Sequence, residues 1–214
     1  MRIGVVSDTH DFFDARLEEL LAGVELILHA GDVGKHEVLD ELGRIAPVRA
    51  VGGNVDSPQL GLPYRTTLQL GGIGGRGGSR AVSAPWATFA SSLQPGVALQ
   101  VEVLHELPAR QTDLEKWANH AEVQGLSPQR REAFLQSFDH NTRVVIFGHS
   151  HLPCAVTLAG RLFFNPGSAG KQRFSVPRCC GVLDVSAKHV EAIILYLQRY
   201  NGKLPEKVRL TVGG

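Results

Sequence analysis

The chain has 214 residues, of which 43% are hydrophobic and 20% are charged, so it carries enough apolar material for a core and too little charge for disorder. Its 22 basic and 21 acidic residues leave a formal net charge of +1, which argues against stable binding to nucleic-acid phosphates. The length favours one domain over residues 1–214, and the apolar runs fall short of the roughly 18 residues that a membrane span needs.

The cellular compartment is suggested by the N-terminus and the cysteines. The chain reaches Asp8 without the long apolar stretch of a signal peptide. Its three cysteines, two of them adjacent, provide no disulfide framework. We therefore expect a reducing cytoplasm and no membrane partner.

The first 56 residues alternate between short apolar strands and amphipathic helices. Leu17, Leu20 and Leu21 share one helix face, and the strands are rich in β-branched residues. Strands and helices that alternate at this spacing predict parallel βαβ units. We expect strands at 2–6, 24–29 and 47–51 and helices at 11–21 and 35–45.

The rest of the chain is richer in strands. Six glycines within residues 71–78 indicate a loop, and Ser127 before Pro128 is typical of a helix N-terminus. Cys179 and Cys180 lie in an apolar strand, where we expect one to be buried and one exposed. We expect helices at 113–123 and 127–139 and strands at 64–70, 98–104, 143–147, 154–158, 161–165, 180–185 and 189–197.

Four polar motifs each follow one of these apolar strands. Because the carboxyl ends of parallel strands meet at one edge of a sheet, we expect their side chains to converge. Taken singly, each has a simpler explanation: a helix cap, a turn pair or a surface histidine. The motifs are Asp8-Thr9-His10, Gly31-Asp32, Gly53-Asn54 and Gly148-His149-Ser150-His151.

These motifs supply carboxylates, one amide oxygen and imidazoles. Mixed oxygen and nitrogen ligands suit Mn, Fe, Ni, Co or Zn better than Ca. Six or seven ligands are too many for one tetrahedral ion and suit two metals about 3.5–4 Å apart that share a carboxylate. Two cations neutralise phosphoryl oxygens and lower the pKa of a water, as phosphate ester hydrolysis requires.

Together with Asn165-Pro166-Gly167-Ser168, the motifs resemble those of the calcineurin-like metallophosphoesterases, and within them the YfcE-type phosphodiesterases. The resemblance covers residues 1–70 and 140–185. It implies an α/β fold, a four-layer α/β/β/α sandwich, with a dinuclear site at one edge. It also implies two divalent metal ions, with Mn or Ni favoured, and a small phosphate ester as substrate. Relatives often form dimers or tetramers, so a homo-oligomer is also implied.

The resemblance implies a role for each motif residue. Asp8, His10 and His151 would bind the first metal, and Asp32 would bridge the two ions. Asn54 and His149 would bind the second metal. Asp32, Asn54 and His149 would take direct part in the hydrolysis of phosphodiesters by a hydroxide that the two metals activate.

Two positions depart from the family pattern. Many relatives have a histidine after the Gly-Asn pair that protonates the leaving oxygen, whereas this chain has Val55, which cannot donate a proton. We therefore expect either a preference for esters with good leaving groups or protonation by another group or by water, with Asp56 as an orienting or assisting residue. The family also has a His-Gly pair that completes the second metal site, whereas this chain has His105 followed by Glu106. His105 is either this ligand or a surface histidine.

A reading-frame shift offers one explanation for the second departure. Residues 75–80 can be encoded so that the frame shifted by one base reads Val-Ala-Val-Ala-His-Gly. Part of residues 73–104 would then be out of frame relative to relatives, and the second metal site would be damaged.

The alternative to a phosphoesterase is a non-catalytic protein-binding scaffold on the same fold, as the retromer scaffold subunit is.

Overall fold

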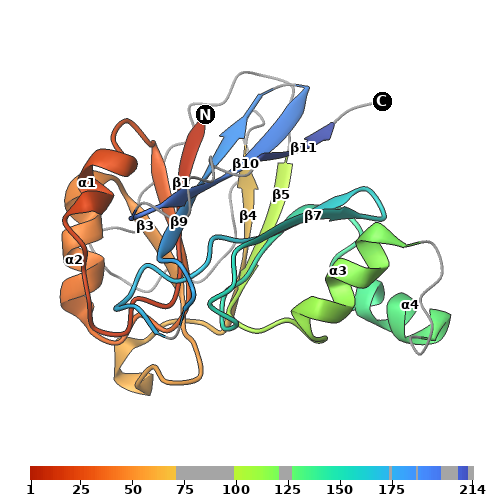
Figure 1. Ribbon diagram of the computed structural model, residues 1–214, viewed down its shortest axis with the longest axis horizontal. Coiled ribbons are helices and arrows are strands. Elements are labelled where there is room, and N and C mark those ends of the chain that lie inside the picture. The colour runs from red at the N-terminus through yellow and green to blue at the C-terminus, as the bar shows by residue number, and fades with distance from the viewer. Residues whose placement is uncertain (71–98, 121–126, 174, 187, 199–206, 212–214) are drawn as a thin grey trace.

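The computed structural model describes residues 1–70, 99–120, 127–173, 175–186, 188–198 and 207–211. Their strands form two sheets that pack face to face (Figure 1). One sheet has the order β11-β10-β9-β1-β2-β3, and the other has the order β4-β5-β6-β8-β7. The strands of the first sheet are β1 (Arg2–Val6), β2 (Leu26–Ala30), β3 (Val48–Val51), β9 (Cys179–Val185), β10 (His189–Tyr196) and β11 (Lys207–Thr211).

The second sheet contains the other strands that lead into candidate site residues. Its β5, β6 and β8 run parallel, while the edge strands β4 and β7 are antiparallel to their neighbours. Likewise, β1, β2 and β3 of the first sheet run parallel, as the alternation predicts. The strands of the second sheet are β4 (Arg65–Leu70), β5 (Leu99–Leu104), β6 (Thr142–Ile146), β7 (Cys154–Leu158) and β8 (Arg161–Asn165).

Helices cover the two outer faces. In Figure 1, α1 (Arg16–Leu20) and α2 (His36–Ile45) lie on the first sheet, and α3 (Gln111–Asn119) and α4 (Pro128–Gln136) lie on the second. A 3-10 turn, Pro58–Leu60, follows β3. Ser127 caps α4, accepting a hydrogen bond from the Arg130 N–H, as expected. The predicted α/β/β/α sandwich is confirmed.

Three apolar cores correspond to the three interfaces between these layers. Because each core needs apolar side chains from the elements on both of its sides, the layering follows from which faces are apolar. The core between the sheets contains Ile3, Val5, Leu28, Val101, Val103, Val144, Ile146 and Phe164. The core under α1 and α2 contains Val6, Leu17, Ile27, Val38, Leu42 and Val182, and the core under α3 and α4 contains Leu114, Trp117, Phe134, Val145 and Phe163.

Three predictions need correction. The helix expected at 11–21 is only Arg16–Leu20, because His10 and Asp11 have positive φ and cannot begin a helix there. Cys179 and Cys180 are both buried, since β9 has the inter-sheet core on one face and the helix-side core on the other. The helices expected at 113–123 and 127–139 end at Asn119 and Gln136. The loop expected at 71–78 lies outside the described residues.

Candidate metal centre

The seven predicted site residues come from strand ends of both sheets. Asp8 and His10 follow β1, Asp32 follows β2 and Asn54 comes three residues after β3 ends. His105 follows β5 directly, and the loop after β6 carries the last two histidines, His149 and His151. The structure brings all seven side chains into one connected cluster of short contacts.

The first part of the cluster contains Asp8, His10 and His151. The Nε2 atoms of His10 and His151 lie 3.1 Å apart, and His151 Nε2 lies 3.4 Å from Asp8 Oδ1. One ligand atom from each of the three residues fits within 4.8 Å of the others, so they are close enough to hold one cation together.

The second part contains His105, Asn54 and His149. The Asn54 Oδ1 atom lies 3.1 Å from His105 Nε2 and 3.0 Å from His149 Nδ1. His105 is buried, while Asn54 and His149 are exposed at the mouth of the site. His105 is therefore not a surface histidine, and its Nε2 atom lies within reach of both Asn54 and Asp32.

Asp32 lies between the two parts. Its Oδ2 atom is 3.8 Å from His10 Nε2 and 3.3 Å from His105 Nε2, so one carboxylate oxygen faces an imidazole of each part. Its other oxygen accepts a hydrogen bond from the Val55 N–H. Asp8, Asp32 and His105 also form a second set whose ligand atoms lie within 4.8 Å of one another.

Backbone conformation singles out these residues independently of the family pattern. Within the part of the chain that the structure describes, seven non-glycine residues have positive φ. Such residues are uncommon and store local strain, which gathers at functional sites. Five of the seven are candidate ligands: Asp8, His10, Asp32, His149 and His151.

Two glycines allow the strand ends to approach closely. A Cβ at Gly53 would collide with the Asp32 side chain, and a Cβ at Gly148 would collide with Ser7 and with the Asp8 carboxylate. In these two motifs glycine is therefore needed because the neighbouring carboxylates leave no room for a Cβ, and not only because of the geometry of a turn.

Hydrogen bonds orient the ligands. His105 Nδ1 lies 2.8 Å from the Ala30 carbonyl, which can only accept, so Nδ1 donates to it and Nε2 is the ring nitrogen that faces Asp32 and Asn54. Ser7 Oγ donates to Asp8 Oδ2 at 2.6 Å. The Asp56 carboxylate accepts the backbone N–H groups of Val33, Gly34 and Gly53, as its expected orienting role requires. The sequence analysis does not identify Ser7 as a site residue, because nothing in the sequence distinguishes this serine from others.

The electrostatics of the site favour a cation. Burial raises the pKa of the Asp8 carboxyl to about 7. Burial also acts to raise the pKa of Asp32, but contacts with His105 and the Val55 N–H outweigh it and lower that pKa. Burial lowers the pKa of His10. Burial and the neighbouring His10 lower the pKa of His151 to about 4, so both imidazoles are neutral and can coordinate a metal ion. Two buried carboxylates and neutral imidazoles fit divalent ions well.

The region of the reading-frame hypothesis is only partly described. Residues 71–98 lie outside the described residues, so the hypothesis for that stretch stays a prediction. From residue 99 onward, β5 is a fully buried strand between β4 and β6, and it delivers His105 to the site. Glu106 stands where the family has glycine, and its Oε1 lies 3.7 Å from His149 Nε2.

Comparison with known protein families identifies the family to which the chain belongs. The family model of the calcineurin-like phosphoesterase superfamily domain matches residues 1–188. The chain belongs to this superfamily. The resemblance inferred from the motifs is thereby confirmed, while a single domain over residues 1–214 stays a prediction.

Relatives within the superfamily include two archaeal proteins, each named a probable metallophosphoesterase. The protein of Methanocaldococcus jannaschii is 28% identical over 185 residues, which is 84% of this chain and 71% of the relative. The protein of Methanothermobacter thermautotrophicus is 27% identical over 202 residues, which is 91% of this chain and 92% of the relative.

Solved structures share the superfamily fold. Vps29 of Chaetomium thermophilum matches with a TM-score of 0.65 and 19% identity, covering 99% of this chain and 98% of Vps29. A conserved predicted phosphoesterase of Streptococcus pneumoniae matches with a TM-score of 0.56 and 20% identity, covering 97% of both chains. No helix in the described part of this metallophosphoesterase is long and apolar enough to cross a membrane.

Proposed function

We propose that this metallophosphoesterase hydrolyses phosphate esters, phosphodiesters above all, with two divalent metal ions, Mn being the first to test. The observation that carries the proposal is the position of the Asp32 carboxylate. One of its oxygens faces His10 of one ligand group and His105 of the other, as a carboxylate shared by two ions requires.

The geometry supports the assignment of residues that the family resemblance implies. Asp8, His10 and His151 would hold the first ion, and Asn54, His105 and His149 would hold the second, with Asp32 shared by both groups. The six candidate ligands from the motifs thus have a place in the proposed site, and His105 would complete the second group.

When bound, the two ions would supply positive charge against the phosphoryl oxygens and lower the pKa of a water for attack on phosphorus. The protein holds the buried carboxylates and His105 behind the reaction site, while Asn54 and His149 lie exposed at its mouth. An ester that enters from solvent therefore meets the Asn54 amide and the His149 imidazole, which can donate hydrogen bonds to phosphoryl oxygens.

The leaving group receives little help from the protein. Val55 directly follows Asn54 and is 56% exposed at the mouth, where a valine offers no proton. We therefore propose a preference for esters whose alcohol is a good leaving group. A small phosphate ester is the expected substrate class and a homo-oligomer the expected assembly.

The decisive experiment compares wild type with Asp32→Asn on bis-p-nitrophenyl phosphate with added Mn. We expect a metal-dependent rate in wild type that falls by more than about 100-fold in the variant, because the shared carboxylate is lost. Asp40→Asn is the matched control, since Asp40 is an exposed carboxylate on α2 and belongs to none of the motifs. Metal analysis of each protein should show fewer ions per chain in Asp32→Asn alone.

A protein-binding scaffold is the second candidate, which Val55 and Glu106 favour because both replace family residues of the site. Under this alternative, wild type and Asp32→Asn show the same metal-independent background. That outcome would exclude the phosphoesterase proposal.

A further inference from the structure

A cavity adjoins the candidate metal centre. Its volume is about 480 Å³, within the range that small-molecule sites occupy. It is formed where the chain passes from β5 into α3, by the loop after β6 and by the start of α4. His149 lines it, so the cavity opens directly onto the mouth of the metal centre.

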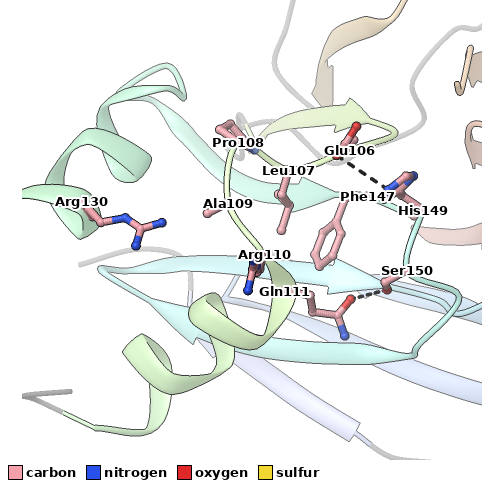
Figure 2. A pocket seen from close by; sticks show the side chains of 11 residues that line it. Glu106, Leu107, Pro108, Ala109, Arg110, Gln111, Arg130, Phe147, His149 and Ser150 are labelled. Carbon is pink, nitrogen blue, oxygen red and sulfur yellow. Dashed lines mark hydrogen bonds and ion pairs between the residues drawn. The ribbon is translucent and has the colours of Figure 1, made fainter. Parts of the chain in front are cut away.

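The walls of this cavity differ in character from end to end. In the view of Figure 2, Glu106 and His149 lie on the right and Arg130 lies on the left, with Arg110 near the middle, below Leu107. Leu107 and Phe147, both buried, lie between Arg130 and His149 in this view. The cavity thus offers an apolar middle that separates a cationic end from the metal centre.

The two arginines have no counter-charge in the described part of the chain. Neither guanidinium makes a hydrogen bond or ion pair with a described residue, whereas Glu106, the acid that lines the cavity, faces His149 at 3.7 Å. Both arginines are exposed and line one cavity, so their positive charges attract an anion into it. Guanidinium groups bind phosphate through paired N–H donors, so the cationic end matches a phosphate group.

The wall that joins the cavity to the metal loop is held in place by side-chain hydrogen bonds. Ser150 Oγ donates to Gln111 Oε1 at 2.6 Å, and Asn165 Nδ2 donates to Ser150 Oγ at 3.0 Å and to the Gly148 carbonyl at 2.9 Å. Gln111 and Ser150 line the cavity, and Gly148 directly precedes His149. A ligand that spans both sites therefore meets a wall already ordered, which lowers the entropic cost of binding it.

We propose that this cavity binds the non-reacting end of the substrate and that this end carries a second phosphate group, recognised by Arg110 and Arg130. The inference rests on the proposed function and narrows it to phosphodiesters with an apolar spacer between the reacting phosphate and a terminal one. Leu107 and Phe147 contact the spacer.

Binding is measured first, by calorimetry in excess Mn, with alkane diphosphonates of increasing chain length and with alkyl monophosphonates of matching length. We expect one chain length to bind about tenfold more tightly as diphosphonate than as monophosphonate, the gain from one added charged contact pair. Arg110→Ala/Arg130→Ala should abolish this difference, and Arg110→Lys/Arg130→Lys should keep part of it. Lys116→Ala and Arg131→Ala are the controls, because they remove cations from the same helices outside the cavity wall.

Hydrolysis is measured second, with p-nitrophenyl alkyl phosphates of the preferred chain length, with and without a terminal phosphonate. Wild type should show an approximately tenfold higher kcat/KM for the phosphonate ester, and the double alanine variant should lose this preference. Its kcat/KM for the ester without the terminal phosphonate should fall much less than that for the phosphonate ester, since neither arginine contacts the reacting phosphate.

The outcomes separate this inference from the proposed function. One outcome is that the enzyme hydrolyses esters without the terminal phosphonate and shows no preference for the phosphonate, in rate or in binding. This outcome overturns the inference and leaves the phosphoesterase proposal standing. Arginine-dependent diphosphonate binding without hydrolysis of any ester supports recognition of the terminal phosphate and overturns the phosphoesterase proposal. A preference that survives in the double alanine variant also overturns the inference.

Discussion

At the scale of single residues, the candidate site stores backbone strain. Asp8, His10, Asp32, His149 and His151 all have positive φ, and each such residue costs about 1–3 kcal/mol relative to a relaxed backbone. Backbone hydrogen bonds between neighbouring strand ends hold the strained segments, for example Asp8 N–H to the Gly31 carbonyl at 3.0 Å. The sequence reveals which side chains gather here but not their backbone conformation, because left-handed φ at non-glycine residues follows from tertiary contacts.

Gly148 is a residue whose replacement should disturb both stability and metal binding. In Gly148→Ala the added methyl group meets Ser7 and the Asp8 carboxylate, so the loop after β6 must move away from β1. We expect a loss of about 1–3 kcal/mol in the free energy of unfolding and weaker metal binding. Urea unfolding and metal titration measure the two effects.

Gly43→Ala is the matched control for this substitution. Gly43 is exposed on α2, and nothing lies within 4 Å of a Cβ placed there. Alanine should therefore stabilise the helix by up to about 1 kcal/mol. Equal effects of the two substitutions would contradict the packing role assigned to Gly148.

His29 should make stability fall as pH drops. It is fully buried, its Nε2 lies 3.0 Å from Thr9 Oγ1, and burial lowers the pKa of its imidazole from 6.5 to about 4. The unfolded chain therefore binds a proton that the folded chain excludes, so stability is complete above about pH 6.5 and declines towards pH 4. Between about pH 7 and pH 5 this group should contribute a loss of about 2 kcal/mol.

The comparison of wild type with His29→Leu isolates this contribution. The free energy of unfolding, measured in urea at about pH 7 and pH 5, should fall less in the variant by about 2 kcal/mol. Other titrating groups are common to both proteins and cancel in the difference. Parallel pH dependences in the two proteins would show that His29 does not govern this loss.

At the scale of elements, strands are predicted better than helices. The bounds expected for β1, β7 and β8 are those observed, because each is a short apolar run between polar or turn residues. The helix expected at 11–21 is shorter than expected because the Asp11 N–H bonds to the Val33 carbonyl rather than within a helix. β11 has no sequence prediction, since its pairing with β10 is a long-range contact.

The strand β5 carries a charged residue whose burial the alternating pattern does not reveal. Glu102 is 2% exposed, and its carboxylate accepts hydrogen bonds from the Arg65 guanidinium of β4, the Thr142 hydroxyl of β6 and the Asp139 N–H. One side chain thus joins three strands of the second sheet. Since His105 directly follows β5, the same contacts hold a candidate ligand in place.

Removal of Glu102 should therefore be costly. Glu102→Ala leaves the Thr142 hydroxyl and the Asp139 N–H without their acceptor, and we expect a loss of about 3 kcal/mol in the free energy of unfolding. Arg65→Ala should lose about 1 kcal/mol, since its side chain is 39% exposed and water replaces the contact. Urea unfolding of both variants checks the order, and a larger loss in Arg65→Ala would refute this account of the network.

At the scale of the whole molecule, the candidate site is a junction between the sheets. Asp8, His10, Asp32 and Asn54 come from strand ends of the first sheet, and His105, His149 and His151 come from strand ends of the second. The motifs predict this convergence because parallel strands end at a common edge, although the facing of two separate sheets is not visible in the sequence. Ions bound here would connect the two sheets.

Metal binding should therefore raise the thermal stability of the whole molecule. An ion that binds only the folded chain adds about 2.7 kcal/mol when present at 100 times its dissociation constant. For a chain of this length that corresponds to an increase of about 5–10 °C in Tm. A thermal unfolding series with Mn, and with a chelator to reverse it, measures this increase. Asp32→Asn should lose most of it while Asp40→Asn keeps it, and an equal increase in Tm for both variants would place the stabilising ion outside this junction.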